Sequence, residues 1–392
     1  MRLSPACLQS TSSWLHSLKV AQLQKIAHTT GIRSSGPKAA LIQRLHAELT
    51  CNVQPDSPGR GMSILSIDMG IRNLAFAHLL VPRGDPTNVD NLPPIPILNA
   101  WQRLSVSSLP LDDPLSSSTE EKGIQTGPDT ETETGIDTGN EPETERKEDF
   151  SPSVYAPHAY FLLTTLLSTY RPTHVLIERQ RFRSGGASAV QEWTLRVGVF
   201  EGMLYAVLCT LARERGGVFA PVVVGVEPRR VLRFWSSSFP SSSSSSSNSS
   251  LSSSLSQEQM EEDQEAGKKK KKTVSSRDGK KLKINLVGRW LTSSSSSEIV
   301  DGNDTRRVGS KIQIGNDPDL RRWVEAYLAQ WLGQGQGKKR SNSPSRTRTQ
   351  MDPSVEIGKL DDLADCLVQG VTWLDWLVMR DRVSRGVGAV MV

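Results

Sequence analysis

The sequence predicts an α/β protein in which a mixed five-stranded sheet is flanked by helices and preceded by a small helical module. Three observations predict this fold class. Apolar segments of strand length come first in hairpin order, and later strands alternate with helix-length apolar segments. Long low-complexity tracts between these elements contain too few apolar residues to join a core. That order is typical of one mixed sheet with helices on its faces.

The small module covers residues 14–50, where apolar residues recur at helical spacing and two short helices are separated near Gly31. The segment LKVAQLQKIAHTTGIRSSGPKAALIQRL resembles a SAP module, a helix-extended-helix unit that generally binds the DNA backbone. The resemblance implies that Ser35, Gly36 and Lys38 offer backbone amides and a cation to a phosphate at the start of the second helix. A helical hairpin used for protein contact is the alternative.

A linker at residues 51–61, which holds two prolines and two glycines, leads to a larger domain at 62–380. The first two strands of this domain flank Gly70 and predict a hairpin. Strands are expected at 64–69, 74–81, 97–106, 174–178 and 218–226, and helices at 155–170, 189–215, 282–291, 320–331 and 360–378. Disordered insertions are expected near 107–150, 236–280, 293–317 and 333–353.

The charge of the chain is distributed unevenly. The net charge is +5, but residues 111–150 hold 13 acidic and 3 basic residues, a local charge of −10 that leaves +15 on the remainder. A basic folded body favours a polyanionic partner such as nucleic acid.

The four cysteines form no CxxC pair, and the six histidines are scattered, so zinc-ligand spacing is absent from the sequence. This pattern favours a reducing compartment and, for any metal, oxygen ligands. No apolar run approaches the roughly 20 residues needed to cross a bilayer. We therefore expect neither a membrane partner nor a small-molecule cofactor.

Five acidic residues form the candidate catalytic set. Asp68 lies in the apolar strand ILSIDMG and Glu178 ends the strand HVLIE, positions where an ionised carboxylate is costly unless it is paired or binds a metal. Asp361, Asp362 and Asp365 begin a helix, where a spacing of three or four residues puts side chains on one face.

Each acid also has a purely structural interpretation. Asp68 is suited to a turn before Gly70, Glu178 to a surface ion pair, and the aspartates of KLDDLADCLVQG to helix capping on a solvated face. Nevertheless, a mixed sheet of this kind brings two strand-end acids and a pair of acids on a later helix together at one edge, and the acids of this chain occur in that order. Four oxygen ligands without histidine or cysteine favour a hard cation such as Mg²⁺ or Mn²⁺.

Four segments carry a more specific resemblance. SIDMGIRNLAF, VLIERQRFRS, EPRRVLRFW and KLDDLADCLVQG resemble the sequence blocks of the fungal mitochondrial Holliday junction resolvases, cruciform-cutting endonucleases related to the bacterial RuvC resolvase. The resemblance implies a ribonuclease H-like fold. It also implies that Asp68, Glu178, Asp365 and one or both of Asp361 and Asp362 are catalytic metal ligands, with the doubled aspartate leaving the fourth ligand open.

The chemistry that this resemblance implies uses two Mg²⁺ ions per active site, with Mn²⁺ as an alternative. Two such ions activate a water molecule for attack on the scissile phosphate and stabilise the leaving 3′ oxygen, so a protein nucleophile is not needed. A variant assisted by a lysine remains open, and Lys359 is close to the aspartates in sequence.

Arginines next to the catalytic blocks are candidate DNA contacts. Arg179, Arg181 and Arg183 follow Glu178 directly and are expected to bind the phosphates beside the scissile bond. Phe182 is a candidate for unstacking a base at the branch point, with core or rim packing as the alternative. The second candidate group, with Phe234 and Trp235 packing in the core, consists of Arg229, Arg230 and Arg233.

The sequence therefore predicts a structure-selective endonuclease that nicks two opposed strands of a four-way DNA junction. Paired cuts need two active sites, so we expect a homodimer. The alternatives are a nuclease acting on an RNA strand of a hybrid or on a flap, and a non-catalytic SAP-tethered DNA-binding protein. The first acidic residue is Glu48, and a serine-rich, acid-poor start is typical of a mitochondrial presequence. Together with the family resemblance, this start predicts the mitochondrial matrix as the location. A DNA-binding module at the N-terminus would also be poor in acidic residues, which is the alternative explanation.

Overall fold

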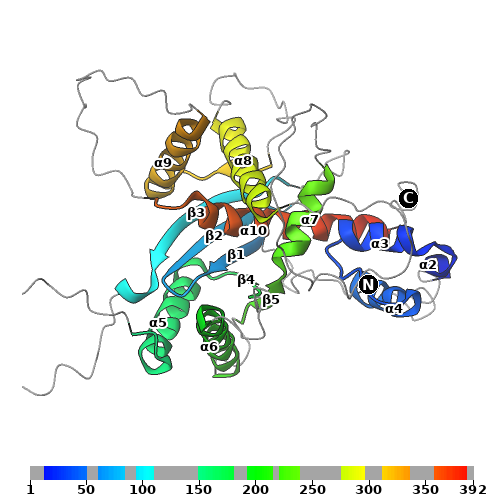
Figure 1. Ribbon diagram of the computed structural model, residues 1–392, viewed down its shortest axis with the longest axis horizontal. Coiled ribbons are helices and arrows are strands. Elements are labelled where there is room, and N and C mark those ends of the chain that lie inside the picture. The colour runs from blue at the N-terminus through cyan, green and yellow to red at the C-terminus, as the bar shows by residue number, and fades with distance from the viewer. Residues whose placement is uncertain are drawn as a thin grey trace, which may run out of the picture.

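The computed structural model describes residues 13–50, 61–83, 94–109, 149–180, 192–214, 220–238, 275–295, 311–335 and 357–385. Within these ranges the chain forms a mixed sheet covered by helices on both faces, with a small helical module packed at one end (Figure 1). The predicted α/β class, ribonuclease H-like in element order, is confirmed.

The sheet has the strand order β5-β4-β1-β2-β3-β6. The first three strands form an antiparallel meander, while β4 is parallel to β1 and β5 is parallel to β4. The strand bounds are β1 Met62–Met69, β2 Asn73–Val81, β3 Ile97–Ser105, β4 His174–Glu178, β5 Val222–Val226 and β6 Gln313–Ile314. Because β1, β4 and β5 are parallel, their carboxyl ends meet at one edge of the sheet.

Helices α5 (Pro152–Tyr170) and α6 (Glu192–Glu214) cover one face of the sheet, where their apolar side chains pack on Leu65, Ile67 and Phe76. The other face is covered by α7 (Pro228–Ser238), α8 (Ser276–Ser295), α9 (Pro318–Gly335) and α10 (Leu360–Ser384) (Figure 1). Helices α5, α7 and α9 begin at a proline, whose fixed φ and missing N–H suit the first helical position.

Two predictions about the sheet and its insertions need correction. A sixth strand, β6, pairs with Ile97 and Leu98, so the described sheet is not five-stranded. It falls in the predicted insertion 293–317, where Ile312 is fully buried and its carbonyl accepts a hydrogen bond from Ser294 Oγ at 2.6 Å. The 236–280 insertion was also predicted too wide, because α7 continues to Ser238 and α8 begins at Ser276. The other two insertions lie mostly outside the described residues.

The N-terminal module consists of α2 (Ser13–Ser17), α3 (Val20–Thr29) and α4 (Lys38–Thr50). Its own small core is formed by Leu15, Leu23, Ile26, Ala27, Ile32, Leu41, Ile42 and Leu45. Val383 near the end of α10 joins this core, so the ordered body continues past the predicted boundary at residue 380. Gly31 has a φ of 68°, which glycine adopts without strain where the chain leaves α3.

Helix α6 corrects a further expectation. The sequence was expected to contain no apolar run long enough to cross a membrane. Among the described residues, α6 is long enough and, with a mean hydropathy of 1.5, apolar enough to do so. Its side chains Val197, Phe200 and Leu204 pack into the core between α5 and the sheet. The apolar character of this side of α6 is therefore explained by its packing in the core.

Candidate metal centre and nucleic-acid interface

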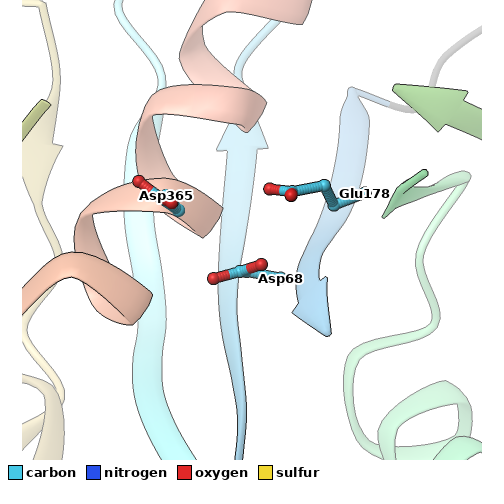
Figure 2. Close-up of side chains that lie close together, drawn as sticks. All are labelled: Asp68, Glu178 and Asp365. Carbon is cyan, nitrogen blue, oxygen red and sulfur yellow. The ribbon is translucent and has the colours of Figure 1, made fainter. Parts of the chain in front are cut away.

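Three predicted acids converge at the carboxyl ends of the parallel strands. Asp68 follows Ile67, which pairs with Ile177 of β4, so the register places Asp68 and Glu178 on neighbouring strands. Asp365 reaches them from the second turn of α10 (Figure 2). One carboxylate oxygen from each of the three residues lies within 4.8 Å of the others. Each of the three residues is partly rather than fully buried by surface area.

The electrostatics of this cluster are unfavourable. Burial raises the pKa of Asp68 well above its ordinary value, and the charges of Glu178, Asp365 and Asp362 raise it further. Burial also raises the pKa of Asp365, although the ammonium of Lys283 opposes this. A multivalent cation would remove the repulsion, and an all-carboxylate donor set suits a hard cation. The residues present therefore fit a Mg²⁺ or Mn²⁺ site.

Lys283 is a site residue that the sequence interpretation missed. Its Nζ lies 2.6 Å from Asp365 Oδ1, and its side chain is only 13% exposed. Burial lowers the pKa of Lys283, but the charges of Asp365, Glu178 and Asp68 together raise it overall, so the ammonium stays protonated. The signal in the sequence was a lysine at the helical spacing of the buried Leu286 and Val287 on α8. This lysine, rather than Lys359, lies in the acidic cluster.

The doubled aspartate of α10 lies beside the three-acid cluster and has basic partners of its own. Asp361 forms an ion pair with Lys280 at 2.5 Å, and Asp362 accepts a hydrogen bond from Arg103 Nε at 2.9 Å. The charge of Asp362 raises the pKa of Asp68, so the two carboxylates are electrostatically close. Neither belongs to the three-acid group, and the identity of a fourth ligand stays a prediction.

Buried hydrogen bonds fix the elements that carry the acids. Ser66 Oγ, two residues before Asp68, donates to the carbonyl of Cys366 at 2.7 Å. Gln369 Nε2 donates to Ser66 Oγ and to the Ile67 carbonyl at 3.1 and 3.2 Å. These contacts hold α10 against β1. They went unpredicted because they join residues about 300 positions apart.

A second polar contact joins the two strand ends themselves. Gln180 Nε2 donates to the carbonyl of Met69 at 3.2 Å, so it bridges the end of β4 to the end of β1. The backbone N–H of Gln180 donates to Glu201 on α6, also at 3.2 Å. An open pocket lies beside this contact, with Arg179, Glu201, Tyr205 and Gly225 in its lining.

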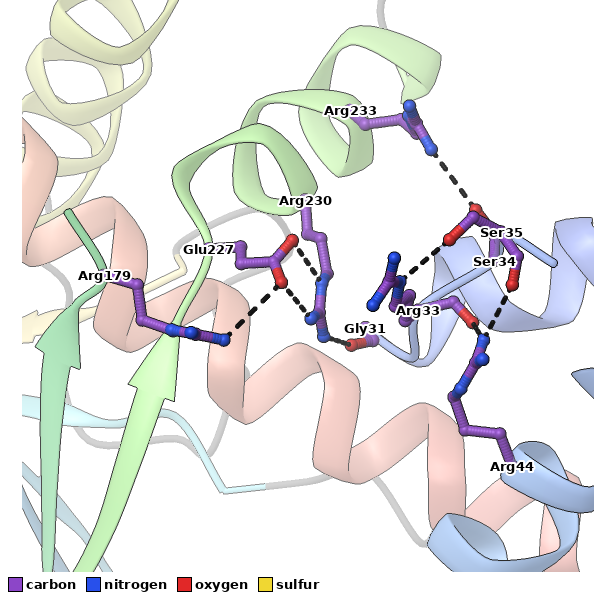
Figure 3. A network of polar contacts seen from close by, with 9 residues as sticks. All are labelled: Gly31, Arg33, Ser34, Ser35, Arg44, Arg179, Glu227, Arg230 and Arg233. Atoms are coloured by element: carbon purple, nitrogen blue, oxygen red, sulfur yellow. Dashed lines mark hydrogen bonds and ion pairs between the residues drawn. The ribbon is translucent and has the colours of Figure 1, made fainter. Parts of the chain in front are cut away.

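The predicted phosphate-binding residues of the N-terminal module lie together before and at the start of α4, with Ser35 and Gly36 in the loop and Lys38 as the first helical residue. Gly36 has a φ of 105°, and Lys38 is exposed with its Nζ donating to the His16 carbonyl at 3.0 Å. Ser35 accepts a hydrogen bond from Arg33 Nε at 2.8 Å (Figure 3). Arg44 donates to the carbonyls of Arg33 and Ser35 and so braces the loop from α4. Neither arginine was among the sequence candidates.

The predicted arginine groups have different surroundings. Arg179 is 59% exposed and its Nη1 lies 3.9 Å from Glu227 Oε1, while Arg229 is exposed. Arg230 is bound to Glu227 and to the Gly31 carbonyl, and Arg233 contacts the N-terminal module (Figure 3). The predictions for Arg181, Phe182 and Arg183 concern residues outside the described ranges.

A ribonuclease H-like sheet with clustered carboxylates at its strand ends defines a class of α/β proteins with a candidate metal centre. Comparison with known families identifies the group within this class. The chain belongs to the family described as mitochondrial resolvase Ydc2 / RNA splicing MRS1, which it matches over residues 64–383. Residues 14–46 match the SAP domain, so the predicted module and family are confirmed.

The chain is also similar to individual proteins. The mitochondrial cruciform cutting endonuclease 1 of Schizosaccharomyces pombe is 30% identical over 225 residues, which cover 56% of this chain and 67% of the relative. The crystal structure of the yeast mitochondrial Holliday junction resolvase Ydc2 aligns with a TM-score of 0.49 and 21% identity, over 94% of this chain and 99% of that one. Thermus thermophilus RuvC aligns with a TM-score of 0.24 and 14% identity, over 45% and 79% of the two chains.

Proposed function

We propose that this chain is a metal-dependent endonuclease that resolves four-way DNA junctions in mitochondria. The observation that carries the proposal is the convergence of Asp68, Glu178 and Asp365 within 4.8 Å at the strand ends of a member of this family. The 30%-identical relative is named a mitochondrial cruciform cutting endonuclease, which supports both the substrate and the location.

The three carboxylates, with Asp362 or Asp361 as a fourth, would hold two Mg²⁺ or Mn²⁺ ions. When bound, these ions supply the positive charge that activates water and stabilises the leaving oxygen at phosphorus. In the protein, Asp68 and Glu178 are held in register by the β1 and β4 pairing, and Asp365 is held by the packing of α10 on β1. This rigid arrangement sets the spacing of the ligands before DNA arrives.

Basic side chains beside the acids would bind the DNA strand being cut. Lys283 neutralises part of the acidic charge through Asp365, and its ammonium would also attract a phosphate oxygen bound at the same site. Arg179 follows Glu178 directly and is exposed, which suits contact with the neighbouring phosphate. The loop around Ser35 and Lys38 supplies a second phosphate contact in the SAP module.

Resolution of a four-way junction requires two opposed cuts, and we propose a homodimer formed through the outward side of α6. Leu195 and Val199 on this side are 47% and 48% exposed. At Gly198 and Gly202 a side chain would meet nothing within 4 Å. An exposed apolar stripe on a helix that packs its other side in the core suits an isologous helix pair from two copies.

The dimer is tested by replacing Leu195 and Val199 with glutamate and measuring the mass by analytical ultracentrifugation. We expect a monomer that nicks one strand without the paired second cut. Ser168→Glu, on the exposed side of α5, is the surface control and should stay dimeric. A double variant that remains dimeric would assign the contact to another surface.

The substrate is tested by incubating purified protein with end-labelled four-way junction, flap, RNA–DNA hybrid and linear duplex in Mg²⁺. We expect paired symmetric cuts in the junction and little cutting of the duplex. The second candidate, an RNA-directed activity, is favoured by the family description, which also names RNA splicing. Preferential cutting of the hybrid would support it, and binding of all four substrates without cutting would support a non-catalytic DNA-binding protein.

A further inference from the structure

The SAP module is packed tightly against the catalytic domain. Gly31, at the end of α3, lies against the indole of Trp376, and a Cβ built at Gly31 would lie 2.1 Å from that ring. Val383 from α10 is 5% exposed within the core of the module. Because the module and the catalytic domain share an apolar core and are in such close contact, the module does not move independently of the domain.

Three arginines of the catalytic domain hold the module, two through its backbone and one through a side chain, and Figure 3 shows two of them, Arg230 and Arg233. Arg380 Nε donates to the Thr30 carbonyl at 2.9 Å, and Arg230 Nη1 donates to the Gly31 carbonyl at 3.1 Å. Arg233 Nη1 donates to Ser34 Oγ at 3.3 Å. The carbonyls lie at the C-terminal end of α3, where free acceptors and the helix dipole both favour cations. The contacts therefore set the orientation of the module as well as its position.

The same contacts lead back to the metal centre. Glu227, directly after β5, binds Arg230 at 2.6 Å and lies 3.9 Å from Arg179 Nη1. The backbone N–H of Arg179 donates to the Val226 carbonyl at 2.9 Å, beside Glu178. The module is thus anchored to the strand ends that carry the catalytic acids.

Helix α10 sets the distance between the metal centre and the residue that holds the SAP module. Asp365 and Arg380 lie on one unbroken helix, and 15 residues at about 1.5 Å each separate them by about 22 Å. At about 3.4 Å per base pair, this length corresponds to about six or seven base pairs of DNA.

We infer that the SAP module is a fixed reader of a junction arm, which selects branched over linear DNA because its orientation to the metal centre is locked by Arg230 and Arg380. The inference rests on the proposed junction-resolving function and deepens it. Two phosphate-binding surfaces held at a fixed angle bind together only to DNA whose backbones reach both, and that joint binding raises affinity without further contacts.

The test is the double variant Arg230→Gln with Arg380→Gln, assayed for binding without divalent metal so that no cutting occurs. We expect the affinity for a long-armed four-way junction to fall about tenfold, with linear duplex binding unchanged, because the loosened module loses effective concentration. The matched control, Arg213→Gln with Arg322→Gln, removes the same charge from exposed positions elsewhere and should change neither affinity. Equal losses on junction and duplex, or no loss, would overturn the inference.

An arm-length series on the unmodified protein provides a test that is independent of how the variant folds. Junction affinity should drop as arms are shortened below about seven base pairs. In the double variant this step should disappear. Affinity independent of arm length would also overturn the inference. Parent protein that shows the step but cuts no junction in Mg²⁺ would contradict the proposed function while leaving the fixed module supported.

Discussion

The two ends of β1 hold opposite kinds of polar cluster. Near its start, His78 accepts a hydrogen bond from Asn99 Nδ2 at 3.0 Å, and its other ring nitrogen lies 2.8 Å from Ser63 Oγ. Burial lowers the pKa of His78 to about 4, so the ring is neutral and both nitrogens have partners. At the far end, Asp68 faces Glu178 and other carboxylates that raise its pKa.

The difference separates structural from functional polar groups. The histidine cluster satisfies its own hydrogen bonds and needs nothing from outside the fold. The carboxylate cluster concentrates like charges that only a bound cation or a proton relieves, apart from the partial help of Lys283. A site that carries unfavourable electrostatics in the free protein is therefore the better candidate for function.

The largest effect is expected from Asp68→Asn. Cutting should fall by roughly a thousandfold or more, the scale seen when a group that stabilises transition-state charge is lost. Without metal, the variant should melt no lower than the parent, because burial and Glu178 already oppose ionisation of Asp68. Added Mg²⁺ should raise the melting temperature of the parent more than that of the variant.

Asp365→Asn should reduce cutting to a similar extent, and both variants should still bind junctions. Asp381→Asn, at the exposed end of α10, is the control and should cut normally. An Asp68 variant that cuts near the normal rate would remove Asp68 from the active site.

The doubled aspartate should give the next largest effect. Asp362→Asn is expected to lower the cutting rate by about 10- to 100-fold, the range typical of residues that support a metal site. Asp361→Asn should cost only a few-fold, because Asp361 is paired with Lys280 at the edge of the cluster. Single-turnover cutting rates measure both, and the reverse ranking would make Asp361 the fourth ligand.

At the other end of β1, His78 should make the protein sensitive to acid. Its folded-state pKa of about 4 lies below the ordinary value of 6.5, so the unfolded chain binds the proton first. Stability from the neutral ring is complete above about pH 6.5 and is lost as pH falls through 4, a total of about 3 kcal/mol.

Urea unfolding of the parent and of His78→Gln between pH 7 and pH 4 isolates this contribution. Glutamine is polar but does not titrate, so the stability difference between the two proteins should shrink or reverse as pH falls. Parallel pH profiles would show that folding does not lower the pKa of His78.

The smallest effect is expected from Arg229→Gln. Arg229 is exposed at the start of α7, next to Arg230, which binds the Gly31 carbonyl. Loss of one phosphate contact should weaken junction and duplex binding equally and reduce the salt dependence of binding by about one ion. A salt titration of the binding constant measures it, and an unchanged slope would show that Arg229 does not contact DNA.

Much of the fold and three of the five candidate acids were predictable because they leave local patterns. Asp68 and Glu178 stand out as charges at the ends of apolar strands, and Asp365 by its helical spacing. β6 was missed because two residues show no alternation. The place of Lys283 in the site and the inward contacts of Arg230 depend on partners distant in sequence, which no local pattern specifies.

The position of α10 also determines when activity can arise. Asp365 meets Asp68 only after the last helix packs on the first strand, through contacts between residues about 300 positions apart, such as Ser66 with Cys366. Closing so long a loop is slow compared with forming the local hairpin of β1 and β2. A chain that has formed its sheet but has not yet packed α10 lacks one of the three carboxylates of the candidate metal centre, so the centre is completed only late in folding.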